Sequence, residues 1–400
     1  MEISNNQTNR LDSISIFRAV TMFLMIFVND FWTLENVPKW LLHSAAEEDA
    51  MGLSDVVFPV FLFIVGLSLP FAIGNRISKG DSNRQVLVHI MERTLALLLM
   101  GIFIVNYENL ASEGMLIGKY AWEILMVIAF FLIWNQYPKQ TETGGQFKLL
   151  KLTGYVLLLF LAAIYKGGDQ QNPVWMKTHW WGILGLIGWS YLICAVTYLY
   201  FKHSLVLIVI SWLILVTFNL ADFAGWLSTL DNVRDTVWIV GSGAIPAFTM
   251  AGLVASMLYQ RYYNKHNARI FISILILLGI FCLLYGFGTR SFWGISKIRA
   301  TPAWLGICTG ISFIFYGIFF WLVEIMNFKK WANVLKPAGE ATLTCYLIPY
   351  LWYAMVTIAD ISLPIFFRTG VIGLVKSALF SITVIIVTGI INRFGIKLKI

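Results

Sequence analysis

One histidine lies in a loop that is rich in polar side chains. Residues 28–59 read VNDFWTLENVPKWLLHSAAEEDAMGLSDVVFP, and they place His43 between Asp30 and Asp55. An imidazole can take a proton from an amine or hydroxyl, or carry an acyl group itself, and a nearby carboxylate can raise its basicity and fix its tautomer. The alternative is an interfacial polar residue beside Trp40, because one histidine in an acidic loop is a weak signal.

Two side chains that flank this loop have a structural and a chemical interpretation. Asn29 can cap the preceding helix, or its amide can donate a hydrogen bond to a developing oxyanion. Asp55 follows Ser54 and opens an apolar run, so it fits the first turn of a helix, where a carboxylate contributes roughly 0.5 to 2 kcal/mol. The interpretations are compatible, because a capped helix end aims a side chain rigidly.

Two cations are candidates for ligand contacts. Arg18, in SISIFRAVTMFLMIFV, lies about one turn inside an apolar run, where it either contacts an anionic ligand such as a phosphate or snorkels to the inner surface. Lys297, in ISKIRATPAWLG, precedes Thr301 and Pro302, which suit the N-cap and first position of a helix. The capping interpretation leaves Lys297 unexplained, and we keep it as a candidate outer-site residue.

Aromatic residues offer a second kind of candidate. His179 and Trp180, in HWWG, are the best platform for a sugar ring, although the aromatic belt of a membrane interface predicts nearly the same residues. In LKPAGEATLTCYLIPYLWY, Pro349 should kink a helix, and Thr342, Thr344 and Tyr346 are placed to line a cavity beside it.

The composition predicts a membrane protein. Of 400 residues, 58% are hydrophobic and 12% are charged, which is too apolar for a soluble domain. The net charge of +8 is spread over short loops, a pattern that sets membrane topology, so we expect no nucleic-acid partner. The four cysteines lie in apolar runs without the spacing of a metal site or disulfide framework, so we expect no metal.

The apolar runs predict an all-α, polytopic integral membrane protein. A spanning helix needs roughly 20 apolar residues. We predict about twelve spans, or ten if one pair is miscounted, near residues 14–31, 55–74, 86–105, 120–135, 149–165, 182–200, 204–220, 239–259, 269–287, 302–326, 338–358 and 370–391. Most basic residues then fall on the side of the N-terminus, so both termini are expected in the cytoplasm and the acidic loop with His43 outside.

Several segments resemble a known family. RLDSISIFRAVTMFLMIFVN, the loop with His43, GLSDVVFPVFLFIVGLSL, SKIRATPAW and KPAGEATLTCYLIPY are similar, in order, to the heparan-α-glucosaminide N-acetyltransferase family of membrane acetyltransferases. The middle of the chain, about 140–235, carries little of the resemblance and adds a helix pair. The chain departs from the family pattern at Ser15, at Ala19 and in SAAEEDAMG after His43, changes that reshape the outward loop.

The resemblance implies one transmembrane acyltransferase domain over 1–400 that takes acetyl-CoA from the cytoplasm. By residue, it implies that His43 is the general base or acetyl carrier and that Asn29 orients the acetyl group or steadies the oxyanion. The acceptor would be an amino sugar of the glucosamine type, or a related glycan, outside a bacterial inner membrane. Arg18 is then our first candidate for the cofactor phosphates, with Asp30, Asp55, Lys297, His179 and Trp180 as supporting or acceptor-binding candidates.

Two other functions, a transporter and a scaffold, and one oligomeric state, a homodimer, are alternatives that the sequence leaves open. A secondary transporter or lipid-linked sugar flippase would also have twelve helices and polar groups within the membrane, but the sequence shows no inverted repeat with broken helices. A scaffold without catalysis would leave Arg18 without a purpose. Membrane lipid is an expected partner, and a homodimer is one option for the assembly.

Overall fold

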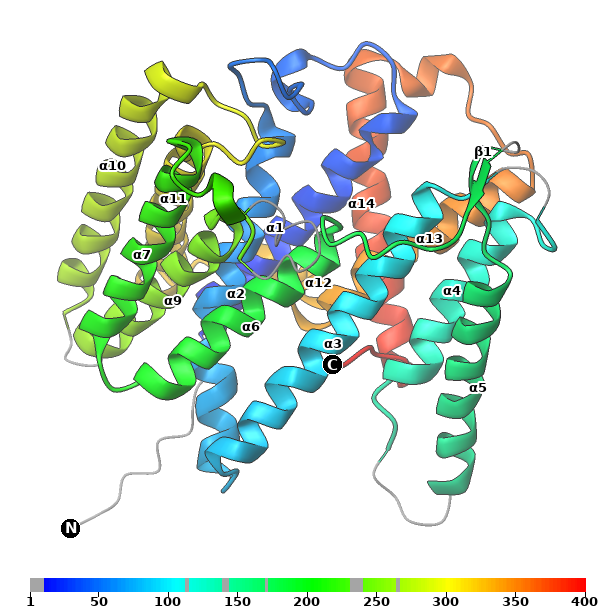
Figure 1. Cartoon of the computed structure of the whole chain (residues 1–400), viewed down its shortest axis with the longest axis horizontal. Coiled ribbons are helices and arrows are strands. Elements are labelled where there is room, and N and C mark those ends of the chain that lie inside the picture. Colours follow the sequence, from blue (N-terminus) through cyan, green and yellow to red (C-terminus); the bar gives the residue numbers. More distant parts are fainter. Residues whose placement is uncertain (1–10, 112–114, 139–143, 170–171, 231–239, 264–266) are drawn as a thin grey trace.

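The computed structural model describes residues 11–111, 115–138, 144–169, 172–230, 240–263 and 267–400. These residues form a helical bundle with one short hairpin (Figure 1). The helices are α1 (Asp12–Asn29), α2 (Leu53–Ser78), α3 (Asn83–Glu108), α4 (Lys119–Trp134), α5 (Gly144–Ala163), α6 (Ile183–Phe201), α7 (Leu205–Phe223), α9 (Ala244–Tyr262), α10 (Ala268–Trp293), α11 (Pro302–Phe320), α12 (Lys336–Glu340), α13 (Thr342–Ile358) and α14 (Gly370–Arg393). The antiparallel hairpin pairs β1 (Gly167–Asp169) with β2 (Asn172–Val174).

Each of the twelve predicted segments contains a helix, and the all-α polytopic class is confirmed. Within the described ranges, nine helices are long and apolar enough to cross a membrane. Two more are shorter, α4 with 16 residues and α13 with 17. The number of crossings and the side of the termini stay predictions, and the predicted start of the eighth segment at 239 lies outside the described residues.

The segment predicted as one helix over 338–358 is divided. The backbone leaves helical geometry at Ala341, with φ −131° and ψ 53°, between α12 and α13. Pro349, where a kink was expected, lies inside α13. The break was missed because alanine is a strong helix former, and only the packing of α12 against α1 and α14 accounts for it.

The share of buried residues distinguishes a central helix, α2, from the helices α10 and α5 on the flanks of the bundle. In the apolar window of α2, 67% of the residues are buried, against 28% in α10 and 17% in α5, which lie on opposite flanks of the bundle (Figure 1). The exposed side chains of α10 include Leu277, Phe281 and Leu284, which suit contact with lipid tails. α2 packs against α1, α9 and α11. The loop between α1 and α2 is therefore attached to a helix that is held by three neighbours.

The α2–α9 contact depends on two glycines. A Cβ atom on Gly66 would lie 1.8 Å from the carbonyl oxygen of Thr249, and one on Gly252 would lie 1.8 Å from that of Phe63. Such close backbone approach is typical of helix packing in membranes, where van der Waals contact replaces the hydrophobic effect. Any larger side chain must push the two helices apart.

We expect Gly252→Ala to lower the stability of the protein by about 1 to 3 kcal/mol, because overpacking forces the backbones to move. The matched control is Gly74→Ala, also in a helix of this pair, since a Cβ at Gly74 meets nothing within 4 Å. Thermal unfolding in detergent at a fixed scan rate checks this, and equal midpoints for the two variants would contradict it.

Candidate functional site

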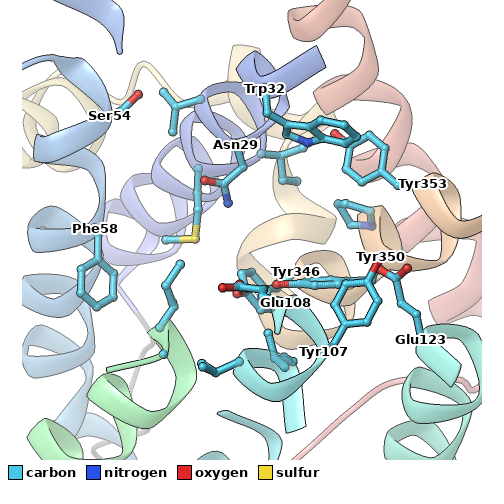
Figure 2. A pocket seen from close by; sticks show the side chains of 18 of the residues that line it. Asn29, Trp32, Ser54, Phe58, Tyr107, Glu108, Glu123, Tyr346, Tyr350 and Tyr353 are labelled. Carbon is cyan, nitrogen blue, oxygen red and sulfur yellow. Dashed lines mark hydrogen bonds between the residues drawn. The ribbon is translucent and has the colours of Figure 1, made fainter. Parts of the chain in front are cut away.

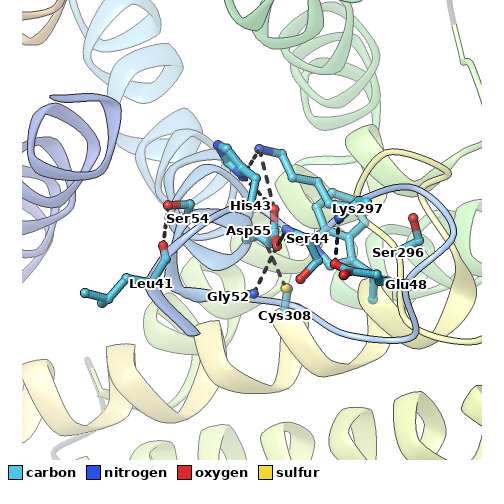
Figure 3. Close-up of polar contacts among 12 residues, drawn as sticks. Leu41, His43, Ser44, Glu48, Gly52, Ser54, Asp55, Ser296, Lys297 and Cys308 are labelled. Carbon is cyan, nitrogen blue, oxygen red and sulfur yellow. Dashed lines mark hydrogen bonds and ion pairs between the residues drawn. The ribbon is translucent and has the colours of Figure 1, made fainter. Parts of the chain in front are cut away.

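His43 and Asp55 form a hydrogen-bonded pair (Figure 3). The Nδ1 atom of His43 lies 2.6 Å from Oδ1 of Asp55. The other carboxylate oxygen accepts backbone N–H groups from Ser44 at 3.1 Å and from Gly52 at 3.0 Å. Asp55 is 1% exposed and His43 is half-exposed. With Nδ1 donating to the buried carboxylate, Nε2 is the ring nitrogen available to a ligand.

The same contacts explain the position of the loop. The bond from the Gly52 N–H to Asp55 closes the start of α2, so Asp55 occupies the first turn of the helix as expected. The nearby carboxylate that contacts the His43 ring is that of Asp55. Ser54 Oγ donates to the carbonyl oxygen of Leu41 at 2.6 Å. A Cβ on Gly52 would lie 1.9 Å from the Leu42 carbonyl oxygen, so the loop folds tightly back on the helix start.

Lys297 reaches the pair from the loop between α10 and α11. Its Nζ lies 3.2 Å from His43 Nδ1 and 4.0 Å from Asp55 Oδ1. Because the Nδ1 proton is directed to the nearer Asp55, we interpret the contact of Lys297 with the ring as electrostatic. Burial lowers the pKa of Lys297, and the Asp55 carboxylate partly opposes that shift.

The loop that carries Lys297 is fastened to the acidic loop. Asp49 accepts the Ile295 N–H at 2.7 Å and Nε of Arg290 at 2.9 Å, and Ser296 Oγ donates to the carbonyl oxygen of Ala46 at 3.0 Å. The Ile295 N–H, with Arg290, holds the pKa of Asp49 below its usual value despite some burial. Asp49 is therefore an anion at neutral pH and joins segments almost 250 residues apart.

A cavity of about 610 Å³ opens beside this pair. Asn29, His43, Ser54 and Lys297 all line it, so the structure brings together the predicted catalytic residues and Lys297. Figure 2 shows the Asn29 amide directed into the cavity. The amide makes no capping hydrogen bond at the end of α1 or the start of the 3-10 turn that follows, so the capping interpretation of Asn29 is wrong.

The opposite wall was largely missed by sequence reasoning. Its polar and aromatic residues come from the end of α3, the start of α4, α13, the segment after α1 and the segment before α6: Trp32, Tyr107, Glu108, Lys119, Tyr120, Glu123, Trp181, Tyr346, Tyr350 and Tyr353. Of the three cavity candidates proposed beside Pro349, Tyr346 lines the cavity, and Thr342 and Thr344 do not. A signal was present for Glu123, a carboxyl group inside the apolar run AWEILMVIAFF.

Three supporting candidates lie elsewhere. Asp30 is fully buried and contacts Lys376 at 2.7 Å, Tyr353 at 2.6 Å and Ser377 at 2.5 Å, so it joins the end of α1 to α13 and α14. His179 and Trp180 do not line the cavity, whereas their neighbour Trp181 does. His179 packs against Trp181, and Trp180 packs against Trp189.

Arg18 lies at a second, smaller cavity. This cavity of about 320 Å³ is lined by Arg18, Ser68 and Asn75 together with apolar residues of α1 and α2. The guanidinium donates to Ser68 Oγ and to the Gly339 carbonyl oxygen at 3.4 Å, beside the break after α12. Eleven residues separate Arg18 from Asn29, which is about 17 Å along a helix. The two cavities therefore lie at well-separated levels of α1.

We expect Lys376→Met to destabilise the protein by about 3 to 5 kcal/mol, because it leaves Asp30 as a buried charge without its cation. The double variant Asp30→Asn with Lys376→Met should recover much of that loss. Thermal unfolding in detergent measures both, with Lys329→Met as the control, since its ion pair with Asp12 is about half-exposed on each side. A double variant as unstable as the single one would refute the charge argument.

The N-terminal part of the chain, which contains Asn29, His43 and Asp55, is similar to known proteins. Residues 10–137 match the family model described as "Heparan-alpha-glucosaminide N-acetyltransferase, catalytic". The mouse heparan-alpha-glucosaminide N-acetyltransferase is 25% identical over 182 residues, which cover 41% of this chain and 26% of the mouse protein. The human protein of that name is 33% identical over 97 residues, 24% of this chain and 14% of the human one.

The chain thus spans about a quarter or less of the length of these curated relatives. The matched residues contain Arg18, Asn29, His43, Asp55 and Glu123, whereas Lys297 and α13 lie beyond them. Residues 10–137 are therefore similar to the catalytic region of heparan-α-glucosaminide N-acetyltransferases.

Proposed function

We propose that this protein transfers the acetyl group of acetyl-CoA to the amine of an amino sugar on the far side of a membrane. The observation that carries the proposal is the His43–Asp55 pair, which opens with Asn29 onto one cavity in the segment that matches the family. The name of the mouse and human relatives describes N-acetyl transfer to a glucosaminide. The positive-inside pattern supports a cytoplasmic N-terminus and an outward loop for His43, so in this proposal acetyl-CoA enters from the cytoplasm and the acceptor binds outside.

His43 has a defined part in each of two routes. In direct transfer, the amine nitrogen bonds to the thioester carbonyl carbon, the carbon–sulfur bond breaks, and the amine proton passes to Nε2 and then to the departing thiolate. In the stepwise route, Nε2 bonds to the carbonyl carbon and the carbon–sulfur bond breaks, releasing the CoA thiolate. The amine nitrogen then bonds to the same carbon, the bond to Nε2 breaks, and Nε2 takes the amine proton, which passes to the thiolate. Asp55 stabilises the positive ring in both routes, since it already accepts the Nδ1 proton.

Asn29 and Lys297 act on charge that develops during transfer. The Asn29 amide is directed into the cavity and can donate to the carbonyl oxygen as it becomes negative. The Lys297 ammonium, 3.2 Å from Nδ1, disfavours a long-lived imidazolium and so promotes return of the proton to the leaving sulfur.

Arg18 suits the phosphates of the cosubstrate. Its cavity lies about 17 Å from Asn29 along α1, and acetyl-CoA carries its phosphates and its thioester at opposite ends of a long flexible arm. A contact with an anionic ligand would explain the presence of a partly buried cation in an apolar helix. The contacts with Ser68 and Gly339 hold the guanidinium in place.

We expect His43→Ala to lower the rate of acetyl transfer by about 10² to 10⁴-fold and Asn29→Ala by about 10² to 10³-fold, because each removes a group that acts in the transition state. The assay is transfer from radiolabelled acetyl-CoA to glucosamine by purified protein. His179→Gln, which changes a histidine outside the cavity, is the control. Full activity in His43→Ala would refute the mechanism.

The label also separates the two routes. In the stepwise route, parent protein incubated without acceptor carries acetyl label on His43, and His43→Ala carries none. In direct transfer, neither protein carries it.

We expect Arg18→Gln to raise the KM for acetyl-CoA by about tenfold or more and to leave the KM for the acceptor unchanged, because one charge-assisted phosphate contact is lost. Initial rates at varied acetyl-CoA check this. Arg84→Gln, on the exposed start of α3, is the control for loss of positive charge. An unchanged KM for acetyl-CoA in Arg18→Gln would move the phosphate site elsewhere.

A further inference from the structure

We propose that Glu123 and Glu108, on the wall of the cavity opposite His43, form a subsite that binds the acceptor as a cation, through its primary ammonium group. This inference rests on the proposed function and adds to it the residues that select a charged amine over a hydroxyl. Both carboxylates line the same cavity as Asn29 and His43. Figure 2 shows Asn29 on one side of that cavity and Glu108 and Glu123 on the other.

Glu123 carries the argument, because its carboxylate is buried and incompletely bonded. Glu123 is 2% exposed, and its Oε2 atom has no hydrogen-bond partner among the described residues. The Tyr107 side chain lies near the same carboxylate. A buried carboxylate oxygen left unpaired is costly, and such groups in native proteins usually have a partner, an ion or a ligand. Because Glu123 lines the cavity, a rotation of its carboxylate would let an ammonium ligand supply the missing donor.

The lysine on this wall of the cavity does not fill that role. Lys119 also lines the cavity, but its Nζ lies over the ring of Tyr107, 5.2 Å from the centroid. In the part of the chain that the structure describes, no ion pair within 4.0 Å joins Lys119 to Glu108 or Glu123. Its field moderates the negative charge of the wall, which keeps the two carboxylates compatible, without satisfying Oε2.

Aromatic side chains complete the subsite. Tyr346 and Tyr350 project from α13 beside Glu108, Tyr107 and Glu123 (Figure 2). The two α13 hydroxyls lie 3.2 Å apart, so they present one paired donor and acceptor edge. Tyrosine rings attract cations through their faces, and their hydroxyls can bond to sugar hydroxyls. A hydroxylated primary amine matches this combination of carboxylate, ring face and phenol.

The position of the subsite indicates the acceptor and not the cosubstrate. Glu108 ends α3, and Lys119 and Glu123 lie in the first turns of α4, so the subsite is formed by the end of one helix and the start of the other. It shares its cavity with the end of α1 and the start of α2, which flank the loop of His43. Arg18, the candidate for phosphate binding, lines the other cavity. A negative wall would also repel the phosphates of acetyl-CoA.

The test compares Glu123→Gln and Glu108→Gln with the parent in initial rates of acetyl transfer to glucosamine, and in ligand-induced thermal shift with glucosamine and with glucose but no acetyl-CoA. Glucose has a hydroxyl where glucosamine has the amine. We expect Glu123→Gln to raise the KM for glucosamine about tenfold, with the KM for acetyl-CoA unchanged. Glu47→Gln, an exposed loop carboxylate outside the cavity, is the matched control.

The outcomes are distinct. Parent protein stabilised by glucosamine and not by glucose, with the difference lost in Glu123→Gln, supports the subsite even if no acetyl transfer occurs, in which case the proposed function alone falls. Active Glu123→Gln protein with an unchanged KM for glucosamine overturns the subsite and leaves the function standing. If Glu123→Gln does not fold, Glu108→Gln and the parent's preference between the two sugars decide, and equal stabilisation by both sugars overturns the proposal.

Discussion

The site depends on one buried carboxylate at the start of an apolar helix. Asp55 has almost no exposed surface, so its charge has to be satisfied by hydrogen bonds from the protein. It accepts from the N–H groups of Gly52 and Ser44 and from the His43 ring, and each bond fixes part of the loop. Helix start, loop path and imidazole orientation are therefore consequences of one requirement, and none of them can change alone.

Buried and paired charges also join two parts of the chain that are far apart in sequence. The loop before α11 supplies Lys297 to the pair, and Asp49 binds that loop through Ile295 and Arg290. Three carboxylates of the acidic loop thus make internal hydrogen bonds. Asp55 positions the histidine, Asp49 binds the neighbouring loop, and Glu48 accepts the N–H of Ala45. The family match over residues 10–137 covers only the first half of this arrangement.

Hydropathy was sufficient to locate the helices, because a membrane leaves an apolar run few alternatives to a helix. The polar loop around His43, together with the resemblance, indicated His43 and Asn29. The opposite wall could not be predicted in this way, since it depends on how α4 and α13 pack and on how each is rotated about its axis. One signal was available: Tyr346, Tyr350 and Tyr353 recur at spacings of four and three, which places them on one face of a helix.

The misassigned residues have physical explanations of the same kind. Asp30 follows Asn29 directly, yet successive residues at a helix end point in different directions, and Asp30 turns towards Lys376 while Asn29 faces the cavity. Trp180 and Trp181 differ likewise, since Trp181 lines the cavity and Trp180 packs against Trp189. Composition identifies which residue types gather at an interface, but the backbone direction at each residue decides which of them meets a ligand.

Charge is divided across the cavity in a way that has a chemical consequence. Asn29 lies on one side of the cavity in Figure 2, and Glu108 and Glu123 lie on the other. His43 and Lys297 line the same cavity. In a poorly solvated space the two walls create a field that a neutral ligand would not sense and a cation would. An amine that enters as a cation binds first beside Glu123, and it meets its base, His43, only at the opposite wall. The proton is therefore lost on the side of the cavity away from the carboxylates that bind the cation. Binding and activation are in this way assigned to different carboxylates, with Asp55 serving the histidine and Glu123 the acceptor.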